Sequence, residues 1–245
     1  MSGARLEIEA LGKRFRGLRA VHDVSFAVPA GAIHALIGPN GAGKTTIFNM
    51  IAGVFPPDAG AVRLDGRPIS GLRPDLVCAA GVGRTFQIVK PFKGLSVLEN
   101  VTVGALHRHA DLETARERAG AILDALELGD RRHQLAEALT LPDRKRLEVA
   151  RALATEPTLL LLDEVMAGLR PTEVDRMVTF LRDLNARTGI TVLLIEHVMR
   201  AVMALAAHVV VVSSGEKIAE GTPAEIARHQ AVLDVYLGDA AGDAA

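Results

Sequence analysis

One stretch of eight residues has the residue types and spacing to bind the phosphates of a nucleotide. It matches the pattern G-x-x-x-x-G-K-[ST] at every fixed position. Together with the next residue, we expect it to form the phosphate site: Gly38, Pro39, Asn40, Gly41, Ala42, Gly43, Lys44, Thr45 and Thr46. Glycines let backbone N–H groups approach the phosphate oxygens closely. Lys44 can supply a positive charge near the terminal phosphates, and Thr45 can give its hydroxyl to Mg²⁺.

The residues on either side of this loop support the prediction. Residues 33–37 are predicted to form a short buried strand, and residues 46–52 the start of a helix. A strand, a glycine-rich loop and a helix in that order place an anion at the helix N-terminus. The alternative, a glycine-rich turn with a surface lysine, explains neither flank.

Two carboxylates follow a second apolar run. Residues 159–162 are all leucine, and Asp163 and Glu164 come directly after them. At the end of a buried strand, Asp163 can hold Mg²⁺ through water, and Glu164 can polarise a water molecule for attack on the γ-phosphate. Taken alone, paired acids can equally cap a strand. The phosphate loop upstream favours the catalytic interpretation.

Two more polar residues follow predicted strands. His197 comes after the apolar run 191–195 and can contact the γ-phosphate. Gln87 comes after residues 82–86, and its amide can bind Mg²⁺ or the attacking water. A single histidine at a strand end is usually a polar cap, and a glutamine there means nothing by itself. Both roles therefore depend on the wider pattern.

Composition limits the class of protein. Of 245 residues, 49% are hydrophobic and only 3% aromatic, so the core must consist of Val, Leu, Ile and Ala. The net charge of −1 argues against a general nucleic-acid binder, and we expect no nucleic-acid partner. The single Cys78 excludes an intrachain disulfide and fits a reducing compartment. We expect no signal peptide, because residues 1–10 are interrupted by charges, and no membrane span, because the longest apolar stretch is too short.

The periodicity of apolar residues predicts an α/β protein. Residues 6–9 alternate as in an edge strand, and residues 24–28 and 61–66 extend an antiparallel sheet at the N-terminus. Ser96 and Glu99 have the spacing of a capping box at a helix start. Further helices are predicted at 112–128, 142–155, 171–187 and 198–206, with strands at 158–162, 190–195 and 208–212 and a hairpin strand at 217–221.

The order of these segments resembles that of the ATP-binding subunit of an ABC transporter, over about residues 5–238. The resemblance implies the α/β fold of a P-loop NTPase of ABC type, with an N-terminal antiparallel β-subdomain and an inserted α-helical subdomain. It implies a single ATP-binding domain over 5–238. The parts of this domain are an ATPase core (5–88 and 158–222), a helical subdomain with the signature segment (89–157) and a C-terminal helical segment (223–238).

The resemblance also implies roles for individual residues. Glu164, His197 and Gln87 would be catalytic, and Phe15 would stack on the adenine of ATP. Mg²⁺ would be held by Thr45, Gln87 and, through water, Asp163. A place in the core is the alternative for Phe15.

Within the family, the chain is most similar to branched-chain amino acid importer ATPases of the LivG type. The segments that carry this similarity are 13–21, 84–87, 143–153 and 235–238. It implies an ATP hydrolase at the cytoplasmic face of the inner membrane that powers uptake of branched-chain or related amino acids. The implied partners are permease subunits, indirectly a solute-binding protein, and a second ATPase subunit, either LivF-like or a second copy.

The signature segment departs from the family pattern Leu-Ser-Gly-Gly-Gln, since residues 139–143 are Leu-Thr-Leu-Pro-Asp. Thr140 can keep the hydroxyl that faces the partner's γ-phosphate, whereas Pro142 has no N–H to give. The spacing from Thr140 to Asp143 is still that of a capping box. Val165 replaces a usual Pro, and Arg170 replaces the Asp of the D-loop, so the coupling of two sites is either lost or uses Arg170 differently.

A groove beside Gln87 and the helical stretch is expected to receive a helix of the permease. Phe92, Leu95 and Leu98 can line it, or can equally serve helix packing.

Several alternatives remain for the function. The cargo can differ, as in the similar ATPases for lipopolysaccharide export or for urea and amide import. A soluble ABC protein of translation or DNA repair is disfavoured, because the chain has one phosphate loop and a short interval from Lys44 to Asp163. A catalytically inactive binding module is disfavoured because Lys44, Asp163, Glu164 and His197 are all present.

Overall fold

Three runs of five buried residues form the centre of the fold: β3 (Ile33–Ile37), β7 (Leu159–Asp163) and β8 (Thr191–Ile195). They belong to a six-stranded sheet with the order β10-β9-β3-β8-β7-β6, in a computed structural model that describes residues 3–87 and 90–242. Every neighbouring pair is parallel except β9 with β10. Continuous apolar runs are typical of parallel strands that are covered on both faces.

The remaining strands of this sheet are β6 (Val82–Arg84), β9 (His208–Ser213) and β10 (Glu216–Gly221). A second, antiparallel sheet of order β2-β1-β4-β5 contains β1 (Leu6–Phe15), β2 (Leu18–Val28), β4 (Ala59–Leu64) and β5 (Arg67–Pro68). The structure thus has the predicted N-terminal antiparallel sheet.

The prediction that residues 6–9 form an edge strand is wrong. β1 pairs with β2 on one side and with β4 on the other, so it lies inside its sheet. Leu6 and Ile8 are buried while Glu7 and Glu9 are not. The alternation therefore shows that one face of the strand is buried. It does not distinguish an inner strand from an edge strand, because both can have one buried face.

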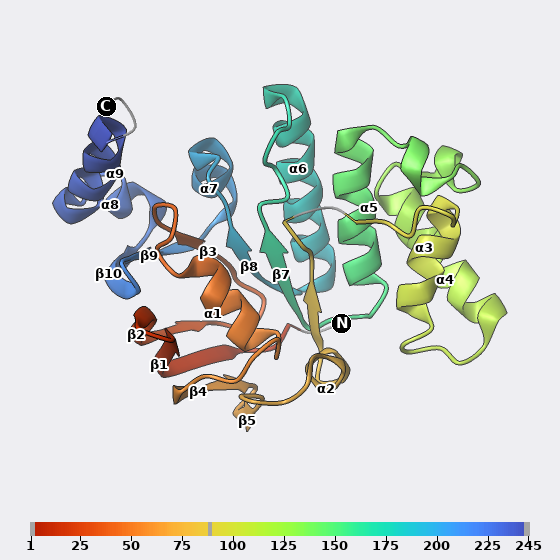
Figure 1. The fold of residues 1–245 in the computed structure, drawn as a ribbon. Helices are drawn as coiled ribbons and strands as arrows, with labels where there is room; N and C mark the ends of the chain where they lie inside the picture. The colour runs from red at the N-terminus through yellow and green to blue at the C-terminus, as the bar shows by residue number, and fades with distance from the viewer. Residues whose placement is uncertain (1–2, 88–89, 243–245) are drawn as a thin grey trace.

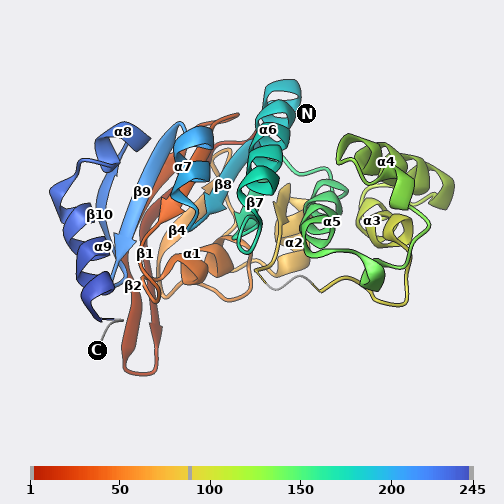
Figure 2. The same cartoon turned by 90° about the horizontal axis from the view of Figure 1, so that it is seen from above.

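The helices are α1 (Lys44–Ile51), α2 (Pro74–Ala79), α3 (Val97–Ala105), α4 (Leu112–Ala125), α5 (Leu141–Leu153), α6 (Pro171–Thr188), α7 (Met199–Leu205), α8 (Pro223–Ile226) and α9 (Gln230–Gly242). Two short 3₁₀ turns, Gly129–Arg131 and Ala136–Ala138, lie between α4 and α5. The predicted capping box at Ser96 starts α3. Helices α3, α4 and α5 lie together at one end of the molecule, and α8 and α9 lie at the other (Figures 1 and 2).

The central sheet separates two hydrophobic cores. In β3, Ile33, Ala35 and Ile37 pack into one core, and Leu36 packs into the other. The first core contains residues of α3 to α7, and the second contains residues of α1, β1, β2 and β4. The helix α1 accordingly lies between the two sheets (Figure 1). This arrangement holds β3, and with it the loop that follows, from both sides.

The predicted boundary between the first core segment and the helical stretch, at residues 88 and 89, lies outside the described residues. Among the described residues, none of the helices combines the length and the hydropathy that a membrane span requires.

A histidine is buried inside the central sheet. His34 of β3 lies beside His208 of β9, with their ring centroids 5.1 Å apart, and its Nδ1 has no hydrogen-bond partner among the described residues. Burial and the neighbouring His208 ring lower the pKa of His34 to about 4, against the opposing charge of Glu220. The fold therefore favours the neutral imidazole.

We predict that His34 makes the free energy of unfolding depend on pH. Below pH 6.5 the unfolded chain binds a proton at this position, and the folded chain binds it only near pH 4. One extra proton on the unfolded chain lowers stability by up to about 1.4 kcal/mol per pH unit. The His34→Leu variant should lose less stability than the wild type as the pH falls from 6.5 to 4, as measured by urea unfolding. Parallel curves would contradict the prediction.

Candidate active site

Four neighbouring parallel strands bring the predicted polar residues to the same edge of the central sheet. In the order β3-β8-β7-β6, they are followed by the phosphate loop, by His197, by Glu164 and by Gln87. The carboxyl ends of parallel strands lie at one edge, where open α/β sheets bind ligands. Their neighbouring positions explain how segments far apart in the sequence form one site.

The glycines of the phosphate loop have conformations that other residues rarely adopt. Gly43, just before α1, has φ 101, and a Cβ on it would lie 2.5 Å from the main-chain oxygen of Ala20. Gly38 has φ 151, and a Cβ there would lie 2.0 Å from the main-chain oxygen of Val212. The loop can therefore follow its path only with glycine at these positions.

Lys44 is the first residue of α1 and points back along the loop. Its Nζ donates hydrogen bonds to the main-chain oxygens of Gly38, at 2.6 Å, and Pro39, at 2.7 Å. Burial lowers the pKa of Lys44, while the nearby Glu164 and Asp163 oppose this shift. The loop thus holds a cation close to two carboxylates.

A groove of about 560 Å³ gathers most of the predicted site. Among its lining residues are Phe15, Asn40, Gly41, Ala42, Gly43, Lys44, Thr45, Thr46, Gln87, Glu164 and His197. Gly38 and Asp163 are buried and do not line it, and Pro39 lines an adjoining hollow with Asn40. The groove therefore places a phosphate loop, a carboxylate, an imidazole and an aromatic ring around one space.

Glu164 directly contacts the other two residues that were predicted to be catalytic. Its Oε2 accepts a hydrogen bond from Nε2 of Gln87 at 2.7 Å, and its Oε1 lies 2.7 Å from Nε2 of His197. Each carboxylate oxygen thus has its own partner. The backbone of Glu164 is left-handed, with φ 50, which is uncommon for a residue other than glycine.

Asp163 is buried and paired with Arg84, which is outside the predicted set of site residues. Its Oδ2 accepts a hydrogen bond from Arg84 at 3.2 Å, and Arg84 also donates to Asn49 of α1 at 2.6 Å. Burial raises the pKa of Asp163, and the Arg84 guanidinium opposes the rise. Its Oδ1 is buried with no hydrogen-bond partner in the described part of the chain. One carboxylate oxygen therefore remains available to a further ligand.

Phe15 lines the groove, and 42% of its surface is exposed. Its ring packs edge-on against Phe55, with 5.2 Å between centroids, and the Lys13 ammonium lies 5.8 Å from the Phe15 centroid. Phe15 thus offers a ring at the groove surface instead of filling the core.

Thr140 is not part of this groove. It precedes α5, and its hydroxyl donates to Oδ2 of Asp143 at 2.6 Å. Asp143 also forms an ion pair with Arg131. The Thr140 side chain accepts no hydrogen bond from the backbone of α5, so the predicted side-chain cap is wrong. The hydroxyl that would have formed the cap is hydrogen-bonded to the Asp143 carboxylate instead.

A smaller groove of about 280 Å³ lies beside α3 and α5. Phe86 and Phe92 line it, and the Arg151 guanidinium lies 4.7 Å from the Phe92 ring centroid. Leu95 and Leu98 do not line it, which for Leu98 favours the alternative of helix packing. Leu98 packs against the first hydrophobic core instead.

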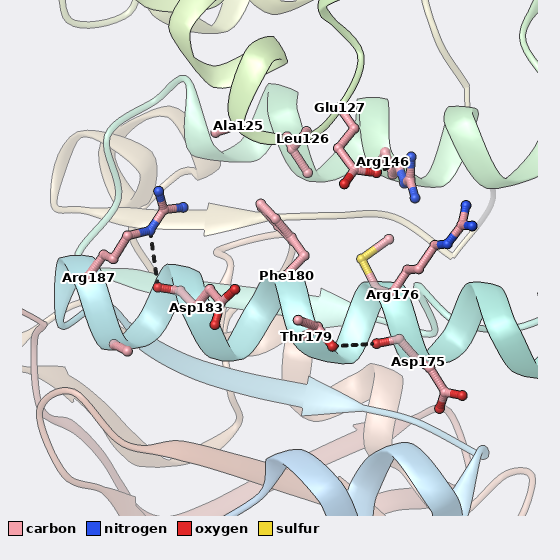
Figure 3. A pocket seen from close by; sticks show the side chains of 12 residues that line it. Ala125, Leu126, Glu127, Arg146, Asp175, Arg176, Thr179, Phe180, Asp183 and Arg187 are labelled. Carbon is pink, nitrogen blue, oxygen red and sulfur yellow. Dashed lines mark hydrogen bonds and ion pairs between the residues drawn. The ribbon is translucent and has the colours of Figure 1, made fainter.

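A groove of about 630 Å³ lies between α6 and the end of α4 with α5 (Figure 3). Phe180 points from α6 toward Leu126, and charged residues surround the opening (Figure 3). None of the predicted site residues lines it. The largest hollow among those described here is therefore separate from the phosphate loop.

Comparison with known proteins agrees with the geometry. A protein-family model described as ABC transporter matches residues 21–167. The high-affinity branched-chain amino acid transport ATP-binding protein BraF of Pseudomonas aeruginosa is 39% identical over 98% of this chain and 100% of its own length. The chain belongs to the ABC transporter family of ATP-binding proteins. A second model, described as branched-chain amino acid ATP-binding cassette transporter, matches residues 216–242 of the cassette.

Two further relatives differ in the cargo that their names state. LivG of Escherichia coli K12, a high-affinity branched-chain amino acid transport ATP-binding protein, is 36% identical over 98% of the cassette and 100% of its own length. LptB of the same strain, a lipopolysaccharide export system ATP-binding protein, is 38% identical over 96% of the cassette and 98% of its own length. Whole-chain identity therefore does not separate the two cargoes.

Solved structures confirm the predicted fold class. The ADP conformation of the ATP-binding cassette MJ1267 has a TM-score of 0.87 and 30% identity, covering 96% of this chain and 99% of that one. A nucleotide-free ATP-binding cassette of an ABC transporter also has a TM-score of 0.87, with 30% identity over 95% and 98% of the two chains. The ABC-type fold extends over nearly the whole cassette.

Three charged residues next to the site, of which Lys145 and Glu196 are buried, were not predicted. Arg84 contacts Asp163, Lys145 of α5 donates to the main-chain oxygen of Glu164, and Glu196 accepts from the main-chain N–H of Met166. Two of these contacts are made with main-chain groups, which have no signature in a sequence. Glu196 had one signal, a carboxylate directly between an apolar run and His197.

We predict that Gly43→Ala disrupts the phosphate loop. The new Cβ would meet a main-chain oxygen in a left-handed conformation, which destabilises the fold by about 1–3 kcal/mol and displaces Lys44. Urea unfolding and titration with a fluorescent ATP analogue would measure both effects. Gly94→Ala is the matched control, because nothing lies within 4 Å of its added Cβ, and stability should change by at most about 0.5 kcal/mol. Equal behaviour of the two variants would refute the assignment.

Proposed function

We propose that this cassette is the ATP-hydrolysing subunit of an importer for branched-chain or related amino acids. The observation that carries the ATPase part is the groove in which the phosphate loop faces Glu164, His197 and Gln87. The cargo is supported by the match of residues 216–242 to the branched-chain amino acid cassette model. Export of lipopolysaccharide is the second candidate, supported by the 38% identity to LptB.

The residues of the groove have different roles in phosphoryl transfer. Lys44 neutralises phosphate charge, and the backbone N–H groups of the loop hold the oxygens. Glu164 orients and activates the attacking water as general base. His197 and Gln87, which contact one carboxylate oxygen each, fix the direction of that base. Phe15 stacks on the adenine from the groove wall.

The site fits Mg²⁺ bound beside the phosphates. The buried Oδ1 of Asp163 has no hydrogen-bond partner among the described residues, and Thr45 lines the groove at the start of α1. Carboxylate and hydroxyl oxygens are ligands that Mg²⁺ prefers. Thr45, Gln87 and, through water, Asp163 would hold the ion, which would neutralise negative charge on the phosphates.

A second ATPase subunit completes the proposed assembly at the cytoplasmic face of the membrane, beside the permease. Thr140, which by the family resemblance would face the partner's ATP, lies outside the groove, and its hydroxyl is bonded to Asp143. Pro142 has no N–H for a phosphate. In a pair with a LivF-like subunit, this altered segment would face the ATP of the partner, and the two composite sites would be unequal. The smaller groove with Phe92 is where a permease helix would dock.

We predict that Glu164→Gln abolishes hydrolysis and keeps ATP binding. The amide preserves the shape of the side chain and cannot accept the proton of the attacking water, so kcat should fall by about 100-fold or more. Phosphate release and fluorescent ATP titration would measure the two effects.

The control for this variant is Glu117→Gln, an exposed position on α4, which should hydrolyse ATP at the wild-type rate.

Light scattering of the Glu164→Gln variant with Mg-ATP tests whether the second ATPase subunit is another copy of this chain. A persistent monomer that binds ATP supports a LivF-like partner, and a nucleotide-dependent homodimer contradicts it. Unchanged hydrolysis in the Glu164→Gln variant would remove Glu164 from the mechanism.

Uptake in cells tests the cargo. A strain without this cassette should take up labelled leucine slowly, and wild-type protein should restore uptake where Glu164→Gln does not. Unchanged leucine uptake with accumulation of lipopolysaccharide at the inner membrane would favour the second candidate. Uptake of labelled urea is measured in the same strains, because the sequence also resembles the ATPases of urea and amide importers.

A further inference from the structure

Two buried charged side chains next to Glu164 have no role in the mechanism above. Lys145 of α5 is 5% exposed, and Glu196, which follows β8, is 1% exposed. Lys and Glu are seldom buried to this extent unless they are paired or functional. Both make hydrogen bonds to the main chain of the segment that begins at Glu164.

Lys145 fixes the main chain of Glu164. Its Nζ donates to the main-chain oxygen of Glu164 at 2.8 Å. On the other side, the main-chain N–H of Glu164 donates to the oxygen of Ile195 at 2.9 Å. These two bonds hold a residue whose left-handed backbone, with φ 50, persists only where its surroundings enforce it. The direction of the carboxylate therefore depends on α5 as well as on the sheet.

Glu196 fixes the residues that follow Glu164. Its Oε1 accepts a hydrogen bond from the main-chain N–H of Met166 at 2.9 Å, and its Oε2 has no partner among the described residues. Because Glu196 directly precedes His197, this bond joins segment 164–170 to the strand end that carries the imidazole. The segments that carry Glu164 and His197 are thus linked through one buried carboxylate.

The two charges also stabilise each other. Burial lowers the pKa of Lys145, and Glu196 opposes this shift more than any of the other three carboxylates, Glu164, Asp163 and Glu148. Burial raises the pKa of Glu196 to about 7, and the Lys145 charge opposes that rise. Removal of either partner would leave the other charge poorly compensated.

We propose that Lys145 and Glu196 are positioning residues for hydrolysis, Lys145 by holding the main chain of Glu164 and Glu196 by holding Met166 and segment 164–170. The inference rests on the proposed function and adds to it two residues outside the nucleotide groove.

The first test is Lys145→Met, which removes the donor and keeps the apolar stem. The kcat for ATP should fall by about tenfold or more, while the Kd for ATP stays within about threefold, because the groove itself is unchanged. Lys145→Arg, which restores a donor, should recover most of the activity. Lys217→Met, a lysine of β10 paired with Glu220, is the matched control and should retain wild-type activity. Wild-type kcat in Lys145→Met would overturn the proposal.

The double variant Lys145→Met, Glu196→Gln separates positioning from charge balance. Glutamine removes the uncompensated carboxylate and keeps an oxygen for Met166, so thermal stability should recover relative to Lys145→Met. The kcat should stay low, because the bond to Glu164 is still missing. Recovery of both stability and kcat would show that Lys145 only balances charge, and the proposal would fail.

Hydrogen exchange gives a readout without ATP. In Lys145→Met, the amides of segment 164–170 should exchange faster than in the wild type, while those of β3 and β9 should not change. A uniform increase over the chain, or no increase, would contradict a positioning role. If the wild type does not hydrolyse ATP, the proposed function fails, and the exchange result still decides whether Lys145 fixes this segment.

Discussion

The parallel pairing of β3, β8, β7 and β6 is the constraint on which the site depends. Parallel strands deliver their carboxyl ends to one edge, so four segments that are distant in the sequence emerge side by side. A strand order that moved β7 away from β3 would separate the phosphate loop from Glu164. The two hydrophobic cores hold this order, because alternate residues of the central strands are buried on opposite faces. The positions of the polar site residues therefore depend on the packing of mainly apolar strands.

Glu164 shows how such an edge becomes a catalytic site. Its carboxylate contacts Gln87 and His197, and its main chain is bonded to Lys145 and Ile195. The strands determine where Glu164 lies, and the surrounding side chains determine how its carboxylate is oriented. A general base needs both, since a small misplacement of the reacting groups slows catalysis strongly. Helix α5, whose N-terminal segment departs from the family signature, also carries one of these supports.

Much of the site could be predicted from the sequence, because each motif follows a predicted strand that ends at the same edge. The phosphate loop, Glu164, His197 and Gln87 meet as expected. The errors came from tertiary contacts. The alternation of residues 6–9 is the same for an inner strand and an edge strand, and the Thr140 hydroxyl bonds to Asp143 instead of capping α5. Lys145 could not be predicted, because its partner is a main-chain group of a distant segment, and Glu196 had only its place between an apolar run and His197 as a signal.

Calorimetric titration of the purified wild type and of Lys44→Ala with Mg-ATP tests most directly whether this edge is a nucleotide site. We expect saturable binding of one ATP per wild-type chain and loss of most of that affinity in Lys44→Ala, with an unchanged circular dichroism spectrum. Lys44 would then exchange its bonds to Gly38 and Pro39 for the phosphates. Absence of binding to the wild type, or equal binding to a folded Lys44→Ala, would contradict the assignment of the phosphate loop.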